Sequence, residues 1–366
     1  MAFGGFWLMY RWLCALTLVA VLAGCGAETA PTTQPTQAPA AGELGAIKTY
    51  LLGKTGDLIN SSTALETASQ RYYDLAKAAN FDYATLWSSK QAEVGTALND
   101  AKAAWLKSSP TYEQMEGIVA GVSSLADFDV TLDAGASAEE GGDSVVNYDL
   151  TLADGRTIAK PGNLFGVTES TLWGTYDAFR VTDVEADING NGTVEFGESL
   201  PEANVLLAAA QKLKATATEL DTAAKAWEPT DTDAFSALVV MVPTMNEYFD
   251  SWKNSRFVAG DSSTQRDFVA ISRLADIGDI LGSLQVVYDS LSPKVAALDA
   301  DQDRQIKTNL QALRDFVADV YKKEQAGQHF TAEESDLLGA EAQNRADAIT
   351  GQVSQIAARL NIKISE

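Results

Sequence analysis

The sequence predicts an all-α fold, and three observations support this prediction. Apolar residues recur every three or four positions through most of the chain after residue 43, as at Ile306, Leu310 and Leu313, which is the spacing of one helix face. The same segments are rich in Ala, Leu, Lys and Gln, the residues with high helix propensity. Thr331 precedes two glutamates, an order typical of a helix start. We therefore expect packed antiparallel helices.

The expected helices follow one another in chain order. Periodic segments occupy residues 44–80, 82–107, 164–180, 306–320 and 332–361, and another helix follows Pro201. The longest apolar stripe runs over about six turns and consists of Phe268, Ile271, Leu274, Ile277, Leu281, Leu284, Tyr288 and Leu291. Residues 227–230 mark a boundary, because one helix stops there and the next can be capped.

Residues 127–163 interrupt the helical pattern. Within them Tyr148, Leu150 and Leu152 alternate with other residues, and Asp154-Gly155 follows at the place of a tight turn. Alternation followed by Asp-Gly is typical of a β-hairpin. The sequence therefore predicts a small hairpin inserted among the helices.

The N-terminus has the form of an export signal. A short apolar run, Trp12–Gly24, follows Arg11 and ends in Leu-Ala-Gly-Cys25, which resembles a bacterial lipobox. We expect residues 1–24 to be a lipoprotein signal peptide and Cys25 to be lipidated, so that the protein is exported and lipid-anchored at the bacterial cell membrane or surface. An ordinary signal peptide is the alternative. Residues 25–43, rich in Pro, Thr and Ala, are expected to form a flexible tether.

Composition excludes several kinds of site. The chain has 27 basic and 50 acidic residues and a formal net charge of −23, so nucleic acid is a poor partner and cations are better ones. One histidine, His329, and two cysteines, Cys14 and Cys25, exclude multi-histidine zinc sites and thiolate clusters within one chain. His329 follows Gly327 at an expected loop–helix junction, where a surface or capping role is the simpler interpretation.

Residues 187–198, DINGNGTVEFGE, match an EF-hand-type calcium loop at every specified position. Gly192 permits the sharp turn, and Val194 is expected to face inward. The predicted ligands are Asp187, Asn189, Asn191, Thr193 through its carbonyl, Glu195 and Glu198 with both oxygens. An all-oxygen set suits a hard cation, so calcium is the expected cofactor. The alternative is a polar turn that binds nothing.

Four stretches resemble the imelysin-like family, in particular the iron-uptake lipoproteins of the EfeO/EfeM type. They are Tyr112–Glu116 with Asp127–Asp129, Asn163–Gly174, Met245–Lys253 with Phe268–Ile277, and Phe330–Gln343. The resemblance implies a two-lobed body of helix bundles, which we place at residues 44–228 and 229–366, and a cleft that binds a metal. It also implies iron as a possible second cofactor and an iron permease complex as a partner.

The family signature, GxHxxE before an apolar-Trp-Gly segment, is incomplete in this chain. Alignment on Glu169, Trp173 and Gly174 places Gly166 where the family has its histidine. The expected second metal site therefore consists of Glu169 with Glu116, Asp129 and Asp276, converging on a harder ion such as ferric iron. The alternatives are a lost site, or carboxylates that are solvated or paired with Arg273.

The function expected from this resemblance is metal binding without catalysis. The peptidase label of the family depends on the missing histidine, so we expect a lipid-anchored envelope protein that assists uptake of iron or another metal. One alternative is a calcium-stabilised surface lipoprotein that binds a protein or small molecule without a transition metal. A hydrolase is the third possibility.

Overall fold

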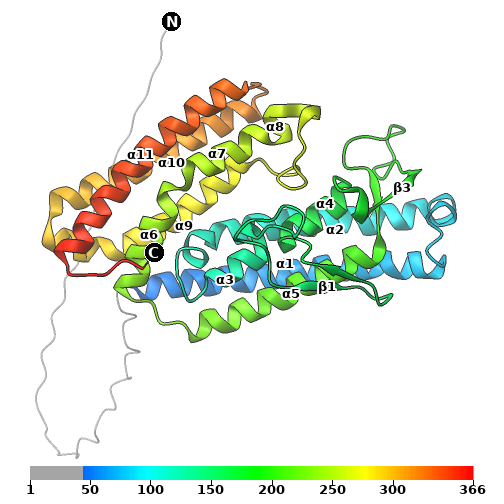
Figure 1. The fold of residues 1–366 in the computed structure, drawn as a ribbon, viewed down its shortest axis with the longest axis horizontal. Coiled ribbons are helices and arrows are strands. Elements are labelled where there is room, and N and C mark those ends of the chain that lie inside the picture. Colours follow the sequence, from blue (N-terminus) through cyan, green and yellow to red (C-terminus); the bar gives the residue numbers. More distant parts are fainter. Residues whose placement is uncertain (1–43, 366) are drawn as a thin grey trace, which may run out of the picture. The chain divides into compact units, whose positions relative to one another are not determined.

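The computed structural model describes residues 44–365. The predicted signal peptide, the tether and the lipidated Cys25 lie outside the described residues. Within them the chain is mainly helical, with two short antiparallel strand pairs, so the predicted helical class is confirmed (Figure 1). None of the described helices combines the length and apolar character that a membrane span requires.

Three long helices form the first group. α1 (Gly45–Ala78) packs along both α2 (Tyr83–Val119) and α5 (Ala203–Ala226). The second helix is longer than the predicted 82–107, because it continues through Pro110. Tyr112 and Met115 beyond the proline are fully buried, and burial of this face outweighs the local cost of proline in a helix.

The second group contains α6 (Asp231–Met241), α7 (Met245–Asn254), α9 (Arg273–Leu298), α10 (Ala300–Gln325) and α11 (Ala332–Arg359). In this group α10 packs on α9 and α11 packs on α7, while α2 of the first group contacts α9. Thr230 and Thr331 begin α6 and α11 with capping boxes, as the sequence predicts for Thr331. α5 ends and α6 begins on either side of residues 227–230, but the division into two lobes stays a prediction.

The predicted β-hairpin is confirmed. β1 (Asp149–Thr151) pairs antiparallel with β2 (Thr157–Ala159), and Leu150 faces Ile158 in the register. Leu150 and Leu152 are both 3% exposed and pack with Val167 and Val205 in a small second core. The hairpin is therefore anchored on α4 (Leu164–Trp173) and α5.

The predicted helix over residues 164–180 is too long, because α4 ends at Gly174. Gly174 has φ +68°, and a Cβ built there would lie 2.6 Å from the Cβ of Ser199. Only glycine combines this left-handed turn with such a close approach. The chain then forms β3 (Arg180–Glu185), which pairs antiparallel with β4 (Ser199–Pro201), a pair that the sequence analysis did not predict.

The long apolar stripe begins later than predicted. Residues 268–272 are not helical, Phe268 has φ +53°, and α9 starts at Arg273 after the N-cap Ser272. Short turns of helix lie elsewhere, namely α3 (Ala126–Asp129), the π-turn at Val130–Ala134 and α8 (Arg256–Ala259). His329 is exposed in the connection between α10 and α11, in agreement with its expected surface position.

Candidate metal site

Five carboxylates and one guanidinium meet where α2, α3, the π-turn and α9 come together. We call this set the acid cluster; it consists of Glu113, Glu116, Asp129, Asp133, Asp276 and Arg273. None of the six residues is more than 8% exposed. Charged side chains are almost never buried to this extent unless they are paired or bind an ion.

The acid cluster contains a compact group of possible metal ligands. Carboxylate oxygens of Glu113, Glu116 and Asp133 all lie within 4.8 Å of one another. Tyr248 donates its hydroxyl to Oε1 of Glu116 at 2.9 Å, whereas Oε2 of Glu116 is buried and has no hydrogen-bond partner. A buried carboxylate oxygen without a partner is costly, and a cation between these three residues would satisfy it.

Arg273 is the resident positive charge of the acid cluster. Its Nη1 lies 3.4 Å from Oε2 of Glu113 and 3.4 Å from Oδ2 of Asp276. Oδ2 of Asp133 is farther away, at 3.8 Å. One guanidinium therefore pairs with three of the five carboxylates, and neither Glu116 nor Asp129 is among its ion-pair partners.

Burial, together with the neighbouring negative charges, raises the pKa values of four carboxyl groups in the acid cluster. Burial, reinforced by the charge of Glu116, raises the pKa of Asp129 to about 7. Burial also raises the pKa of Asp276 to about 7, although Arg273 opposes the shift. The pKa values of Glu113 and Asp133 are raised well above the usual range, chiefly by burial. Without a further cation, some of these groups must therefore hold protons near neutral pH.

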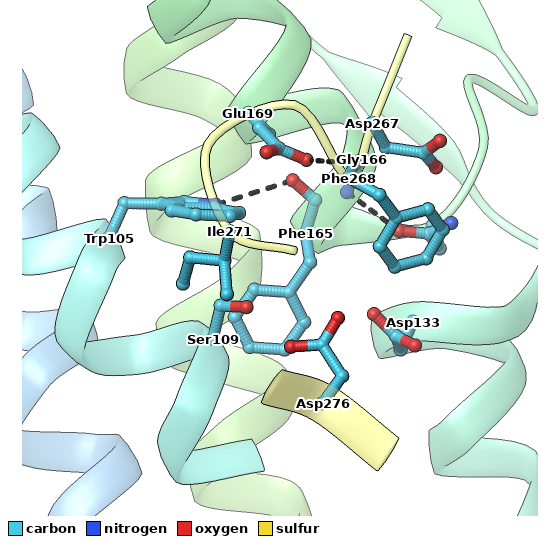
Figure 2. A pocket seen from close by; sticks show the side chains of 11 residues that line it. Trp105, Ser109, Asp133, Phe165, Gly166, Glu169, Asp267, Phe268, Ile271 and Asp276 are labelled. Atoms are coloured by element: carbon cyan, nitrogen blue, oxygen red, sulfur yellow. Dashed lines mark hydrogen bonds between the residues drawn. The ribbon is translucent and has the colours of Figure 1, made fainter. Parts of the chain in front are cut away.

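Glu169 has a different role from the one expected. Its Oε2 accepts the N–H of Phe268 at 2.7 Å (Figure 2). Its Oε1 accepts the N–H groups of Val269 and Ala270 at 2.9 and 2.8 Å. Both oxygens are thus occupied by backbone donors of the segment before α9. This arrangement holds Phe268 in its unusual backbone conformation.

Glu169 nevertheless borders the acid cluster. A cavity of about 10 Å³, room for one water-sized species, is lined by Glu169, Asp133, Asp276 and Phe268 (Figure 2). The structure thus brings Glu116, Asp129 and Asp276 of the predicted set into one cluster and places Glu169 across this cavity. Whether any of them binds a metal stays a prediction.

Two members of the acid cluster were missed in the sequence analysis, Glu113 and Asp133. Glu113 lies three residues before Glu116, and Asp133 lies four residues after Asp129. At these spacings side chains share one face of a helical turn. This spacing was the available signal, and it would have added both residues to the predicted set.

Position 166 has no room for the missing histidine. A Cβ built on Gly166 would lie 2.9 Å from Oδ2 of Asp267 and 3.0 Å from Oδ1 of Asn163. Asn163 is the N-cap of α4 and accepts the N–H of Gly166 at 2.7 Å. A histidine would therefore displace both a carboxylate and a helix cap.

We expect that Gly166→His does not create a metal site and destabilises the protein by about 1–3 kcal/mol, the usual cost of overpacking. Denaturant unfolding and zinc titration, compared with Gly166→Ala, measure the two effects. A histidine variant that is as stable as the wild type and gains zinc affinity would show that Asp267 moves aside readily.

The loop 187–198 connects β3 to β4, whereas the sequence predicts a helix over residues 164–180 before it and a helix after Pro201 behind it. Asp187 accepts the N–H groups of Gly190, Asn191 and Gly192, while the two oxygens of Glu198 accept those of Asn189 and Glu195. The first and last predicted ligands therefore point into the same loop. Gly192 has φ +90°, as the sharp turn requires.

The predicted inward position of Val194 is wrong. Val194 is 47% exposed and Phe196 is 48% exposed, because a loop between two short strands has no partner helix to cover them. Calcium binding by the six predicted ligands stays a prediction.

The chain is similar to one protein family and to a solved structure. A family model described as Imelysin, of a group labelled as peptidases, matches residues 46–355. No curated protein matches the chain. A crystal structure from Parabacteroides distasonis, provisionally described as an iron-regulated protein A precursor, has a TM-score of 0.53 and 16% sequence identity, and the alignment covers 88% of this chain and 96% of that one. At this identity the likeness concerns the fold alone.

Proposed function

The chain belongs to the imelysin family, whose model matches residues 46–355, and from that premise we propose that it is a non-catalytic, lipid-anchored envelope protein that binds a hard metal cation. We propose iron as that cation and delivery to a membrane importer as its purpose. The lipobox that ends at Cys25 supports the anchor. The similar structure described as an iron-regulated precursor supports the link to iron.

One observation carries the proposal, the unpartnered Oε2 of Glu116 beside Glu113 and Asp133. A cation at this position would be bound by oxygen atoms of three carboxylates, a donor set that suits ferric iron better than copper or zinc. It would also offset the negative charge that Arg273 leaves unbalanced. We propose Glu113, Glu116 and Asp133 as the ligands, with Asp129 and Asp276 as neighbouring carboxylates.

Arg273 supports binding by holding part of the acid cluster in place. It pairs with Glu113 and Asp276 from one side, while its guanidinium stacks on the rings of Tyr248 and Phe268, 4.6 and 4.3 Å from their centroids. A guanidinium fixed in this way orients carboxylates without occupying Glu116. Glu169 acts indirectly, because it positions the segment that carries Phe268.

Binding without catalysis is favoured by the placement of the histidine. The one histidine of the sequence, His329, is exposed between α10 and α11, outside the lining of the cavity beside the acid cluster. The family signature is also broken at Gly166. We therefore propose that the peptidase label of the family does not extend to this chain.

Equilibrium titration of the purified, chelator-treated chain tests the proposal. With calcium added back in excess, we expect one equivalent of ferric iron, supplied as its nitrilotriacetate complex, or of the redox-inert Ga³⁺ to bind. Zinc and copper are expected to bind more weakly. A chain that takes up none of these ions would overturn the proposal.

We also propose that the loop 187–198 binds calcium and braces the connection from β3 to β4. Removal of calcium by a chelator is expected to lower the melting temperature by roughly 5 °C, since a ligand at a hundred times its Kd stabilises by about 2.7 kcal/mol. Differential scanning fluorimetry measures this shift.

A matched pair of variants checks that the shift comes from the loop. Asp187→Ala should abolish the response to calcium, whereas Asp183→Ala, an exposed acid on β3, should retain it. A melting temperature that ignores calcium in the wild type would contradict the assignment.

A further inference from the structure

A larger cavity lies apart from the acid cluster, between the loop 187–198 and residues 256–265. Its volume is about 460 Å³, within the range of small-molecule sites. Its walls include residues from the end of α4, from β3, β4 and the loop between them, and from α8 and the segment after it. Those used below are Trp173, Arg180, Phe196, Ser199, Arg256 and Gln265.

Two residues that line this cavity each carry a buried side-chain oxygen without a hydrogen-bond partner. Ser199 is 8% exposed, and its Oγ is buried and unpaired. Oε1 of Gln265 is also buried and unpaired, whereas its Nε2 donates to the carbonyl of Ser251 at 3.1 Å. Buried polar atoms are nearly always paired in folded proteins. Both oxygens are covered in this structure, so each reaches a polar ligand in the cavity only after its side chain turns toward it.

A guanidinium without a carboxylate partner faces the same space. Arg256 lies over the ring of Phe196, 3.3 Å from its centroid, and within residues 44–365 it has no carboxylate at ion-pair distance. Burial lowers the pKa of Arg256, against the opposing effect of Asp261. Arg180 lines the cavity from β3 and is paired with Asp177 at 2.7 Å.

Three acidic residues also line the cavity, but two of them are directed into the loop. Both oxygens of Glu198 accept backbone N–H groups of the loop, and Oε2 of Glu195 accepts Nδ2 of Asn189 at 3.3 Å. Asp261 is exposed at the rim. Among the described residues, Arg256 is therefore the positive charge of this cavity without an ion-pair partner, and Asp261 is the acid that is not directed into the loop.

We propose that this cavity binds a small hydroxylated carboxylate. The guanidinium of Arg256 suits a carboxylate, which it binds with charge-assisted hydrogen bonds. The hydroxyl of Ser199 and the Oε1 of Gln265 suit hydroxyl groups, and the rings of Trp173 and Phe196 offer apolar surface to a carbon skeleton. The site is separate from the acid cluster and does not depend on metal binding there.

Such a ligand can be a cyclic sugar acid or an open-chain hydroxy acid, and calorimetric titration separates the two. D-glucuronate and L-malate are the acidic probes, and D-glucose is the neutral match of glucuronate, all in buffer with excess calcium. We expect at least one acid to bind at least about tenfold more tightly than glucose. Binding of glucuronate alone would assign a sugar acid, and binding of malate alone an open-chain acid.

Two variants test whether the acid binds in this cavity. Arg256→Gln should weaken binding by at least about tenfold, and Ser199→Ala by about fivefold, the effect of one neutral hydrogen bond. Ser199 has no partner to lose, so its variant should melt like the wild type. Arg304→Gln, whose side chain is 71% exposed on α10, is the matched control.

Three results would overturn the proposal. They are failure of both acids to bind at millimolar concentration, equal affinity for glucose and the acids, and unchanged acid binding in both Arg256→Gln and Ser199→Ala. None of these results bears on iron binding by the acid cluster, so the two proposals succeed or fail separately.

Discussion

Glu116→Gln is expected to lower the affinity for ferric iron or Ga³⁺ by more than about 100-fold, because even residues outside the ligand set cost 10–100-fold when they are changed. The amide keeps the size of the side chain, and its oxygen still accepts the hydroxyl of Tyr248, which lies 2.9 Å from Oε1 in the wild type. It removes one negative charge from a buried group of like charges. The metal-free variant should therefore be at least as stable as the wild type at neutral pH.

The combination of lost affinity and retained stability separates a ligand from a structural residue. Titration calorimetry with Ga³⁺ and thermal unfolding of the metal-free protein measure the two quantities. Glu333→Gln, an exposed change in the first turn of α11, is the control for charge. Unchanged Ga³⁺ affinity in Glu116→Gln would remove the acid cluster from the proposed function.

The helices could be predicted where local pattern and tertiary burial agree. Leu310, Leu313 and Val317 recur at helical spacing and are all fully buried, so α10 follows from periodicity alone. Asp154-Gly155 marks the hairpin turn for the same reason, since turn chemistry is local. Such elements need no knowledge of the rest of the chain.

The sequence-based predictions are wrong where contacts between residues far apart in the chain determine the backbone conformation. Phe268 and Ile271 continue the apolar stripe in the sequence, yet three N–H groups at 268–270 bind Glu169, about a hundred positions earlier. These bonds replace the helical ones that the periodicity predicts. Likewise α4 stops where Gly174 meets Ser199, a contact that the sequence around Gly174 does not reveal.

The sequence predicted some members of the acid cluster and missed others, because their convergence also depends on contacts between distant segments. Acidic residues at helical spacing can either face solvent or converge on a metal site. Only the fold distinguishes these two arrangements. Glu116, Asp129 and Asp276 do converge, but Glu169, the residue with the clearest family match, uses its oxygens for the backbone. Gly166 and Glu169 of the family signature both line the cavity, but the oxygens of Glu169 accept backbone N–H groups. Metal binding by this set stays a prediction.

Arg273→Met is expected to destabilise the metal-free protein by about 3–5 kcal/mol at neutral pH, the usual cost of leaving buried charges without their partner. Glu113 and Asp276 lose the guanidinium that lies 3.4 Å from each. Methionine retains apolar contact with Tyr248 and Phe268, so the loss measures mainly the charge. Urea unfolding followed by circular dichroism gives the difference in unfolding free energy.

The pH dependence of this loss identifies its origin. Asp129 and Asp276 have folded-state pKa values of about 7, against 3.8 as the ordinary value. The folded state therefore binds more protons than the unfolded state between these values, and the wild type loses stability as pH rises from about 4 to about 7. Without Arg273 the folded-state pKa values rise further, and the loss of stability continues above pH 7.

The destabilisation by Arg273→Met should consequently be small near pH 5, where the folded carboxyl groups are protonated, and large near pH 8. Arg71→Met, which breaks an exposed pair with Asp100, should cost less than about 1 kcal/mol at both pH values. If Arg273→Met costs the same at pH 5 and pH 8, then Arg273 stabilises the fold by stacking on Tyr248 and Phe268, not by balancing the acid cluster. In that case the carboxylates would already be neutral in the wild type, and the electrostatic argument for a bound cation would lose its basis.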